Sequence, residues 1–295
     1  MRWQKLVRRK RAGRQICMRL CAAATKEDGR RATAPARVLI LALLVAMGRK
    51  SKARKTEDDW EVAGSCRVSQ KPDTNVQLAG PLVPILPPGH AATDTADGEC
   101  LTADVSVLLE DGEGDAMLSA RPILTADECR AWIQWGETTG FVLEKHAQTN
   151  YIAHRDNGRL AVESTELAAA IFERLRPWLP AEVAGKSAVG CNPNLRLYKY
   201  VQGQRFGPHI DQANRLASGA VTEFTVLIYL NSDDGLEGGE TIFHADHGRS
   251  GELLRVKPQA GAALVHAHGA RCLTHEGSEV RRGVKYLLRT DVAYR

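Results

Sequence analysis

The sequence predicts an α+β domain in which helices pack on an antiparallel sheet sandwich or barrel. Two helical patterns lie between residues 123 and 180, and at least five strand patterns follow them with no helix in between. The strand patterns are short, rich in β-branched and aromatic residues, and separated by Gly-, Asp- and Asn-rich turns. They read NLRLYKYV, TEFTVLIYLN, ETIFHA, AALVHAH and VKYLLRTDVAY. We expect their apolar inner faces to form the core.

Each helical pattern has its own start or stop signal. Thr125 and Glu128 form a capping box at the start of LTADECRAWIQWGETTGF, ahead of an apolar stripe. In STELAAAIFERLRPWLP, leucine and isoleucine recur at intervals of four residues, and Pro177 ends the pattern. A shorter segment, ADVSVLL, predicts a strand that precedes both helices.

Charge is distributed unevenly along the chain of 295 residues. Residues 1–55 contain 17 Lys or Arg and two acidic residues, a net charge of +15, so the remaining 240 residues carry −10. Residues 61–97 include the Pro-rich GPLVPILPPGH and the small polar run AATDTADGE, which favour irregular backbone. We therefore predict three parts: a basic extension (1–60) that is disordered or used for targeting, a Pro-rich linker (61–97) and a folded domain (98–295).

The role of the basic extension is open on sequence alone. No acidic residue precedes Glu27, as in an organellar transit peptide, but transit peptides are usually rich in serine and the first serine here is Ser51. The apolar run VLILALLVAM is shorter than the about 20 residues that span a bilayer, so no membrane partner is expected. A disordered or processed extension, an organellar, ER or secretory address, and a nucleic-acid-binding arm stay open. The acidic remainder of the chain offers nucleic acid no broad cationic surface.

The cysteine pattern argues against a disulfide-stabilised protein. Seven cysteines are scattered along the chain, and none forms a CxxC pair. An odd, dispersed set matches neither a disulfide framework nor a zinc-finger signature. It favours a reducing, intracellular compartment, which the sequence does not identify further.

A His-x-Asp pair occurs in RFGPHIDQ. In a β-strand, His209 and Asp211 would share one face while Ile210 points to the opposite, packing side. Together with a second histidine, such a pair forms the ligand set that binds ferrous iron and leaves coordination positions open. The residues alone leave that histidine undecided, and the two in the apolar strand ALVHAH are obvious competitors. The downstream candidates are His244, His247, His266, His268 and His275.

The segment 123–294 resembles the Fe(II)- and 2-oxoglutarate-dependent dioxygenases of the prolyl 4-hydroxylase-like type, as in the catalytic domain of the alpha subunit. Its motifs occur in the family's order: LTADECRAWI, LYKYVQGQRFGPHID, TVLIYLN, GLEGGETIF, THEG and GVKYLLRTDVAY. Lys285 lies ten residues after His275, a spacing that the family shares. One motif alone is a weak signal, but all of them in order are specific.

The resemblance implies a double-stranded β-helix, or jelly roll, with N-terminal helices packed on the major sheet. It also implies that His209, Asp211 and His275 are the catalytic metal ligands, and that Lys285 binds the far carboxylate of 2-oxoglutarate. Neutral imidazoles and one carboxylate suit ferrous iron. A dicarboxylate co-substrate would pair with a lysine that is partly buried.

Two further residues are candidates for contact with the co-substrate by the same resemblance. Tyr200 lies nine residues before His209, where the family often has a tyrosine, and Thr241 follows the GGE turn. Each also has an ordinary structural explanation, because Tyr200 fits a core position and Thr241 fits the end of a turn.

The reaction that the resemblance implies is hydroxylation of a C–H bond. O2 is consumed, 2-oxoglutarate is converted to succinate and CO2, and L-ascorbate serves as an accessory reductant. The expected substrate is a prolyl or other peptidyl residue, or alternatively a small molecule. The region from Thr149 to Asn194, which contains YIAHRDNGRL and CNPN, would border the site. Its polar cluster either contacts the substrate or forms a solvated loop, and consists of Arg155, Asp156, Asn157 and Arg159.

Two other function classes stay open at this point. A non-catalytic jelly-roll module would keep the fold, or even a metal, for binding, and it would be expected to have lost a ligand or Lys285. A nucleic-acid-binding protein would act through residues 1–60, with the folded domain as an accessory.

Overall fold

The computed structural model describes residues 60–62, 74–77, 83–90, 102–109, 117–149, 152–232, 235–245 and 251–295. Apart from Trp60, the predicted basic extension lies outside the described residues. The boundaries between the three predicted parts of the chain therefore stay predictions. Neither α-helix of the described segments is long and apolar enough to cross a membrane.

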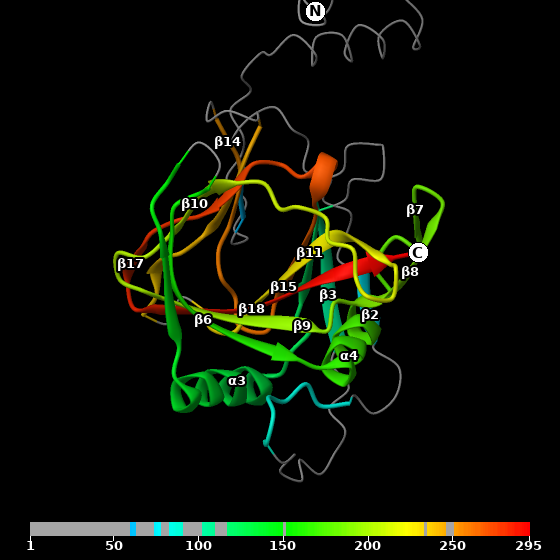
Figure 1. Ribbon diagram of the computed structural model, residues 1–295, viewed down its shortest axis with the longest axis horizontal. Coiled ribbons are helices and arrows are strands. Elements are labelled where there is room, and N and C mark those ends of the chain that lie inside the picture. Colours follow the sequence, from blue (N-terminus) through cyan, green and yellow to red (C-terminus); the bar gives the residue numbers. More distant parts are fainter. Residues whose placement is uncertain are drawn as a thin grey trace, which may run out of the picture. The chain divides into compact units, whose positions relative to one another are not determined.

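Antiparallel β-structure makes up most of the described chain, as predicted, with few helices (Figure 1). The α-helices are α3 (Ala126–Thr139) and α4 (Thr165–Leu175), and a short 3-10 helix covers Gly269–Arg271. The strands before the His-x-Asp pair are β1 (Trp60–Val62), β2 (Thr74–Gln77), β3 (Thr102–Leu109), β4 (Met117–Arg121), β5 (Val142–His146), β6 (Arg155–Glu163), β7 (Glu182–Val183), β8 (Lys186–Cys191), β9 (Asn194–Val201) and β10 (Phe206–His209). Those after it are β11 (Val221–Tyr229), β12 (Glu237–Gly238), β13 (Thr241–His244), β14 (Glu252–Val256), β15 (Ala263–Ala267), β16 (His275–Gly277), β17 (Val280–Arg282) and β18 (Val284–Tyr294).

Most of these strands form one curved sheet. Its main path runs β1-β14-β13-β16-β10-β6-β9-β18-β11-β15-β4-β3-β2, and β12 pairs separately with β17. Because sequence neighbours such as β10 and β11 are separated along this path, the chain crosses repeatedly between the two ends of the sheet. This topology brings β10, β16 and β13 together although 65 residues (210–274) separate β10 from β16 in the sequence.

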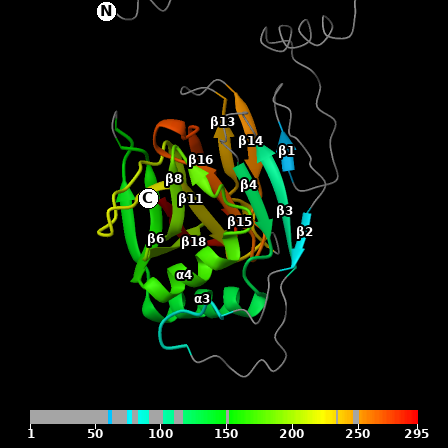
Figure 2. The ribbon, with the colours of Figure 1, turned by 90° about the vertical axis from the view of Figure 1, so that its right-hand side faces the viewer.

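The central strands β9, β18, β11 and β15 have two buried faces. Alternate side chains point to opposite faces of a strand. On one face, Leu197, Val226 and Leu288 pack with Trp132 of α3 and Ile171 of α4 in one apolar cluster. Figures 1 and 2 show both helices along this side of the sheet. The opposite face packs against β13 and β14 in a second cluster, and the interior between these strands contains the candidate site.

Residues of the second cluster come from both layers of strands. Those on the central strands include Tyr198, Tyr200, Leu227, Tyr229, Leu264 and Leu287, and those on β13 and β14 are Phe243, Leu254 and Val256.

Both predicted helices begin as their sequences indicate. The hydroxyl of Thr125 accepts a hydrogen bond from the Glu128 N–H at 3.1 Å, and the Glu128 carboxylate accepts one from the Thr125 N–H at 2.8 Å, which completes the capping box. The Ser164 hydroxyl caps α4 through the Leu167 N–H at 3.2 Å. α4 ends at Leu175, two residues before Pro177, as predicted.

Part of the predicted Pro-rich linker belongs to the folded body. Ile85 is fully buried in the cluster beneath the helices, and its carbonyl oxygen accepts a hydrogen bond from the Trp132 indole at 2.9 Å. β1, at the start of the linker segment, pairs with β14, and β2, within the segment, pairs with β3. An apolar side chain flanked by prolines can therefore enter a core, because prolines restrict the backbone without preventing burial of its neighbours.

A buried ion pair joins the two helices to this segment. Arg174 of α4 contacts both carboxylate oxygens of Glu128 in α3, at 2.7 and 2.8 Å, and both side chains are almost completely buried. The guanidinium also donates to the carbonyl oxygens of Ile123 and Val83. The Ile85 N–H donates to Glu128 at 2.7 Å. Every charge in the group is thus paired and hydrogen-bonded, as burial requires.

Truncation of this ion pair tests its role in stability. We expect Arg174→Ala to lower the free energy of unfolding by about 3–5 kcal/mol, because it leaves the Glu128 carboxylate buried without a counter-charge. Urea unfolding followed by circular dichroism measures the change. Arg176→Ala, which removes an exposed pair with Glu173, is the control and should cost less than about 1 kcal/mol. Equal losses in the two variants would contradict this account.

Candidate metal centre

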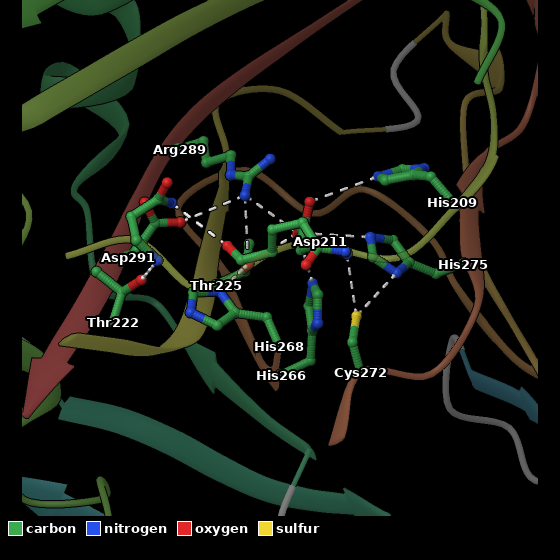
Figure 3. A network of polar contacts seen from close by, with 12 residues as sticks. His209, Asp211, Thr222, Thr225, His266, His268, Cys272, His275, Arg289 and Asp291 are labelled. Atoms are coloured by element: carbon green, nitrogen blue, oxygen red, sulfur yellow. Dashed lines mark hydrogen bonds and ion pairs between the residues drawn. The ribbon is translucent and has the colours of Figure 1, made fainter. Parts of the chain in front are cut away.

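Three of the predicted site residues meet at the pairing of β10 with β16. His209, the last residue of β10, lies directly opposite His275, the first residue of β16, and Asp211 follows two residues after His209. One potential ligand atom from each residue lies within 4.8 Å of the other two. His209 Nε2 is 3.7 Å from Asp211 Oδ1, and His275 Nε2 is 3.7 Å from Asp211 Oδ2 (Figure 3).

Hydrogen bonds orient both imidazoles toward Asp211. Nδ1 of His209 lies 2.9 Å from the Gly207 carbonyl oxygen, and Nδ1 of His275 lies 3.0 Å from the Leu273 carbonyl oxygen. A carbonyl oxygen only accepts, so each Nδ1 carries the proton and each Nε2 keeps its lone pair. This is the tautomer in which backbone carbonyls hold metal-binding histidines in proteins.

The surroundings keep the three groups in the protonation states that a metal requires. Burial and the neighbouring His275 lower the pKa of His209 to about 3, and burial lowers the pKa of His275. Burial alone would raise the pKa of Asp211, but Arg289 and the nearby histidines hold it well below its usual range. Two neutral imidazoles and one carboxylate anion result, so a metal meets no competing proton near neutral pH.

Two residues that the sequence reasoning missed hold the Asp211 carboxylate. The Thr225 hydroxyl donates to Oδ2 at 2.8 Å, and the Arg289 guanidinium lies 3.1 Å from the same oxygen. Arg289 also pairs with Asp291 at 3.3 Å. The signal for Arg289 was present in the sequence, because it lies four residues after Lys285 and therefore on the same face of the last strand.

Ile210, which lies between His209 and Asp211, does not pack as predicted. Ile210 is 43% exposed rather than turned into the core. The reason is that β10 ends at His209, so strand alternation does not extend to Ile210 and Asp211. Asp211 reaches the interior through the loop after the strand.

A buried lysine lies on the same strand as Arg289. Lys285 of β18 is 3% exposed, and its Nζ donates to the Gly239 carbonyl oxygen at 2.6 Å. The Nζ also lies 5.6 and 5.5 Å from the ring centroids of Tyr200 and Tyr229. Within the described segments, Lys285 forms no ion pair with a carboxylate. Burial accordingly lowers its pKa to about 8.

The other two predicted co-substrate residues lie in the surroundings of Lys285. Tyr200 is buried and lies opposite Lys285 in the pairing of β9 with β18. Thr241 is buried at the start of β13, and its hydroxyl lies 2.8 Å from that of Tyr229, whose ring contacts the lysine. These surroundings combine one cation with hydroxyl groups, which suits a carboxylate.

The competing histidines occupy three different environments. His244 of β13 faces Glu276 at 3.4 Å, and His247 lies outside the described residues. His268 lies 3.1 Å from the Thr225 hydroxyl through Nδ1. His266 of β15 lies beside the centre itself, with Nε2 3.9 Å from Asp211 Oδ2.

The polar residues expected to border the site lie on strand β6 rather than in a loop. Arg159 pairs with Glu144 at 2.8 Å, and Asn157 is fully buried. The Arg155 guanidinium lies 4.1 Å from the ring centroid of Phe206, whose ring stacks on His209 at 3.7 Å. Arg155 is thus the member of this group nearest to the candidate centre.

Comparisons with known proteins agree with this geometry. Residues 195–290 match the family model of the 2OG-Fe(II) oxygenase superfamily, and this range contains all six residues predicted for the site. A PKHD-type hydroxylase of Burkholderia ambifaria is 26% identical over 158 residues, which is 52% of this chain and 63% of that protein. Probable prolyl 4-hydroxylase 11 of Arabidopsis thaliana is 39% identical over 72 residues, 24% of this chain and 23% of that protein. The chain thus spans less than two thirds of the curated relatives it matches.

Solved structures also resemble the chain. The viral collagen prolyl hydroxylase of Paramecium Bursaria Chlorella virus-1 is 17% identical with a TM-score of 0.45, over 62% of this chain and 99% of that one. A prolyl-4-hydroxylase of Pseudomonas putida is 19% identical with a TM-score of 0.39, over 61% and 93%. Together with the family model, the relatives confirm the predicted resemblance to 2OG-Fe(II) oxygenases of the prolyl hydroxylase type.

The contact between Thr225 and Asp211 predicts the metal affinity of the centre. We expect Thr225→Val to weaken binding of a divalent ion about 10–100-fold, because the carboxylate loses a hydrogen bond that fixes its orientation. Calorimetric titration with Mn²⁺, which resists oxidation, measures the affinity. Thr290→Val is the matched control, since the buried Thr290 hydroxyl bonds the Asn192 carbonyl oxygen instead. Equal affinities in both variants would exclude the assigned role of Thr225.

Proposed function

We propose that residues 98–295 form a double-stranded β-helix oxygenase that hydroxylates a C–H bond with Fe(II), 2-oxoglutarate and O2. His209, Asp211 and His275 are the proposed metal ligands. The observation that carries the proposal is that Lys285, which is buried and has no carboxylate partner among the described residues, belongs to the same β-structure as this ligand set, two of whose members are buried. Lys285 is the proposed ligand for the far carboxylate of 2-oxoglutarate.

The chemistry of the donor set fits ferrous iron. Two bare imidazole nitrogens and one carboxylate on the same side of an ion leave its other positions free for co-substrate and O2. Iron bound here would activate O2, with 2-oxoglutarate as the co-reductant, and so supply the power to oxidise a C–H bond that no side chain of the protein can supply. L-ascorbate is the proposed accessory reductant. The protein's own contribution is binding, orientation and exclusion of water.

Different residues of the chain are proposed to hold the metal ligand, to orient the co-substrate and to exclude water. Thr225 and Arg289 hold the Asp211 carboxylate in place. Lys285, with Tyr200 and Thr241 beside it, fixes the orientation of the co-substrate by binding its far end. Leu227, Phe243 and Leu254 belong to the same buried apolar cluster as Tyr200 and Tyr229, and such burial excludes bulk water from the neighbourhood of the lysine.

The proposed substrate is a prolyl or other peptidyl residue. The support is the similarity to proteins named PKHD-type hydroxylase and prolyl 4-hydroxylase, and the partly exposed stack of Arg155 and Phe206 on His209. A guanidinium at this position can hydrogen-bond to peptide carbonyl oxygens. A non-catalytic module is not favoured, because such a module would be expected to lack a ligand or Lys285.

Conversion of the co-substrate tests the proposed function. We expect the purified protein to convert 2-oxoglutarate slowly even without substrate. A mixture of protein, Fe(II), 2-oxoglutarate, ascorbate and O2 should therefore form succinate. Asp211→Ala should reduce this rate to background, because the carboxylate ligand is lost. Chromatographic quantification of succinate measures both. A wild-type rate no higher than that of Asp211→Ala would refute the oxygenase proposal.

Substrate identity requires a second measurement. Proline-containing peptides and free amino acids are incubated separately with the active protein, and mass spectrometry detects the gain of one oxygen atom. Modification of peptides supports the peptidyl substrate, whereas modification of free amino acids alone contradicts it.

The pKa of Lys285 predicts a pH dependence. Burial lowers this pKa to about 8, so the ammonium form that attracts a carboxylate is lost as the pH rises above that value. We expect the KM for 2-oxoglutarate to increase between pH 7 and about pH 9. In Lys285→Arg the KM should stay constant over this range, because a guanidinium remains protonated. A wild-type KM that does not change over the same range would contradict this prediction.

A further inference from the structure

The proposed iron site leaves one adjacent imidazole unexplained. His266 of β15 is 2% exposed, and its Nδ1 lies 3.1 Å from the Ala267 carbonyl oxygen. Among the described residues, its Nε2 has no hydrogen-bond partner. The proton therefore belongs on Nδ1, and a bare lone pair is left buried at Nε2. His266 thus has the same tautomer as His209 and His275, and in all three residues Nδ1 donates to a backbone carbonyl oxygen.

This lone pair is directed at the centre. Nε2 of His266 lies 3.9 Å from Asp211 Oδ2, and the ring centroids of His266 and His275 are 4.6 Å apart (Figure 3). Two acceptors that face each other in a buried site cannot bond to one another. A buried acceptor without a partner is unfavourable by about 1–3 kcal/mol. A cation placed beside it removes this cost.

A thiol completes a second set of potential ligands. Cys272 is buried, and its Sγ lies 3.8 Å from Nδ1 of His275. One potential ligand atom each from His266, Cys272 and His275 lies within 4.8 Å of the other two, and all three residues are buried. The short helix Gly269–Arg271 brings Cys272 to this position, three residues before His275.

The two ligand sets differ in chemical character. His209, Asp211 and His275 provide nitrogen and oxygen, which suit ferrous iron. His266, Cys272 and His275 provide two nitrogens and one sulfur, which suit Zn²⁺ and its usual spectroscopic substitute Co²⁺. Sulfur and nitrogen ligands of tetrahedral zinc lie about 3.5 Å apart. Cys272 Sγ lies 3.8 Å from His275 Nδ1, so a metal between these two atoms requires the His275 proton to move from Nδ1 to Nε2.

We propose that His266, Cys272 and His275 form a second metal site, selective for a zinc-class divalent cation, that excludes iron from the proposed oxygenase centre. Both sites require His275, and a neutral imidazole has only one nitrogen lone pair to offer. Occupancy of one site therefore prevents occupancy of the other. On binding, the Cys272 thiol proton leaves to solvent and no redox change occurs. The second metal site is inferred from its geometry alone. Its inhibitory effect rests on the proposed function.

Cobalt absorption tests the site without any enzymatic turnover. The full-length protein is titrated with Co²⁺, and coordination by a thiolate produces a charge-transfer band in the near ultraviolet. We expect this band in the wild-type protein, and its loss when Zn²⁺ is added. Its absence from the wild-type protein would overturn the proposal, independently of any variant.

Variants assign the band to particular residues. Cys272→Ala should abolish it, whereas Cys129→Ala, at a buried cysteine of α3, should retain it. A band that persists in folded Cys272→Ala would come from another cysteine and would overturn the assignment. His266→Gln is the second test should Cys272→Ala fail to fold. It should weaken Co²⁺ binding at the thiolate site by at least about tenfold, and unchanged binding would exclude His266.

Inhibition connects this site to the proposed reaction. Zn²⁺ should suppress Fe(II)-dependent succinate formation in the wild-type protein, and His266→Gln should require at least about tenfold more Zn²⁺ for the same suppression. A cobalt–thiolate band without succinate formation refutes only the oxygenase proposal. Succinate formation without the band refutes only the second metal site.

Discussion

The buried carboxylate of Asp211 is the group on which the candidate site depends. A charged carboxylate out of water is costly unless it is paired and hydrogen-bonded. Arg289 and Thr225 satisfy one of its oxygens, and the other faces His209. Asp211 also lies within 4 Å of Nε2 in three histidines, so the position of every nearby imidazole is set relative to this one anion.

The sheet makes this arrangement rigid. The central strands bury apolar side chains against α3 and α4 on one face, so their alternate residues are fixed on the other face. β18 presents Lys285 and Arg289 on that inner face, and β11 presents Thr225 and Tyr229. The helices therefore contribute to the site without touching it, because they anchor the strands whose opposite face carries the polar groups.

The sequence allowed prediction of those features that depend on local patterns. The helix starts followed from hydrogen-bonding side chains next to apolar stripes, and the strands followed from short β-branched runs between turns. The resemblance to a known family supplied Lys285 and also His275, which no local rule could have selected from the five downstream histidines. In the structure His275 lies beside His209 and Asp211, and Lys285 lies on β18 opposite Tyr200. The roles of both residues stay predictions.

Features that depend on strand register and non-local packing were missed. Thr225 reaches Asp211 only because β11 pairs with β18 and β15. This pairing cannot be predicted from the sequence of any one of these strands. Ile85 enters the core from a Pro-rich segment for a similar reason. Ile210 was placed wrongly because the end of β10 decides its direction, and strand ends are the least predictable part of a pattern.

The distribution of charge along β18 indicates where each proposed ligand belongs. Arg289 lies between two carboxylates, those of Asp211 and Asp291, and Asp291 has Arg196 as a further partner. Lys285, four residues earlier, has no carboxylate within ion-pair distance among the described residues. The neighbouring Glu240 pairs with Arg255 and Arg281 instead.

One inner strand face thus carries a cation that is already neutralised and a cation that is not. A divalent metal is favoured near Asp211, because the bare imidazole nitrogens of His209 and His275 and a carboxylate oxygen converge there. An anion is favoured near Lys285, because the buried ammonium has a carbonyl oxygen and two aromatic rings as neighbours but no carboxylate among the described residues. A molecule with a metal-chelating end and a distal carboxylate satisfies both positions at once. This charge distribution supports the proposal that Lys285 binds the far carboxylate of 2-oxoglutarate while the other end of that molecule binds the metal.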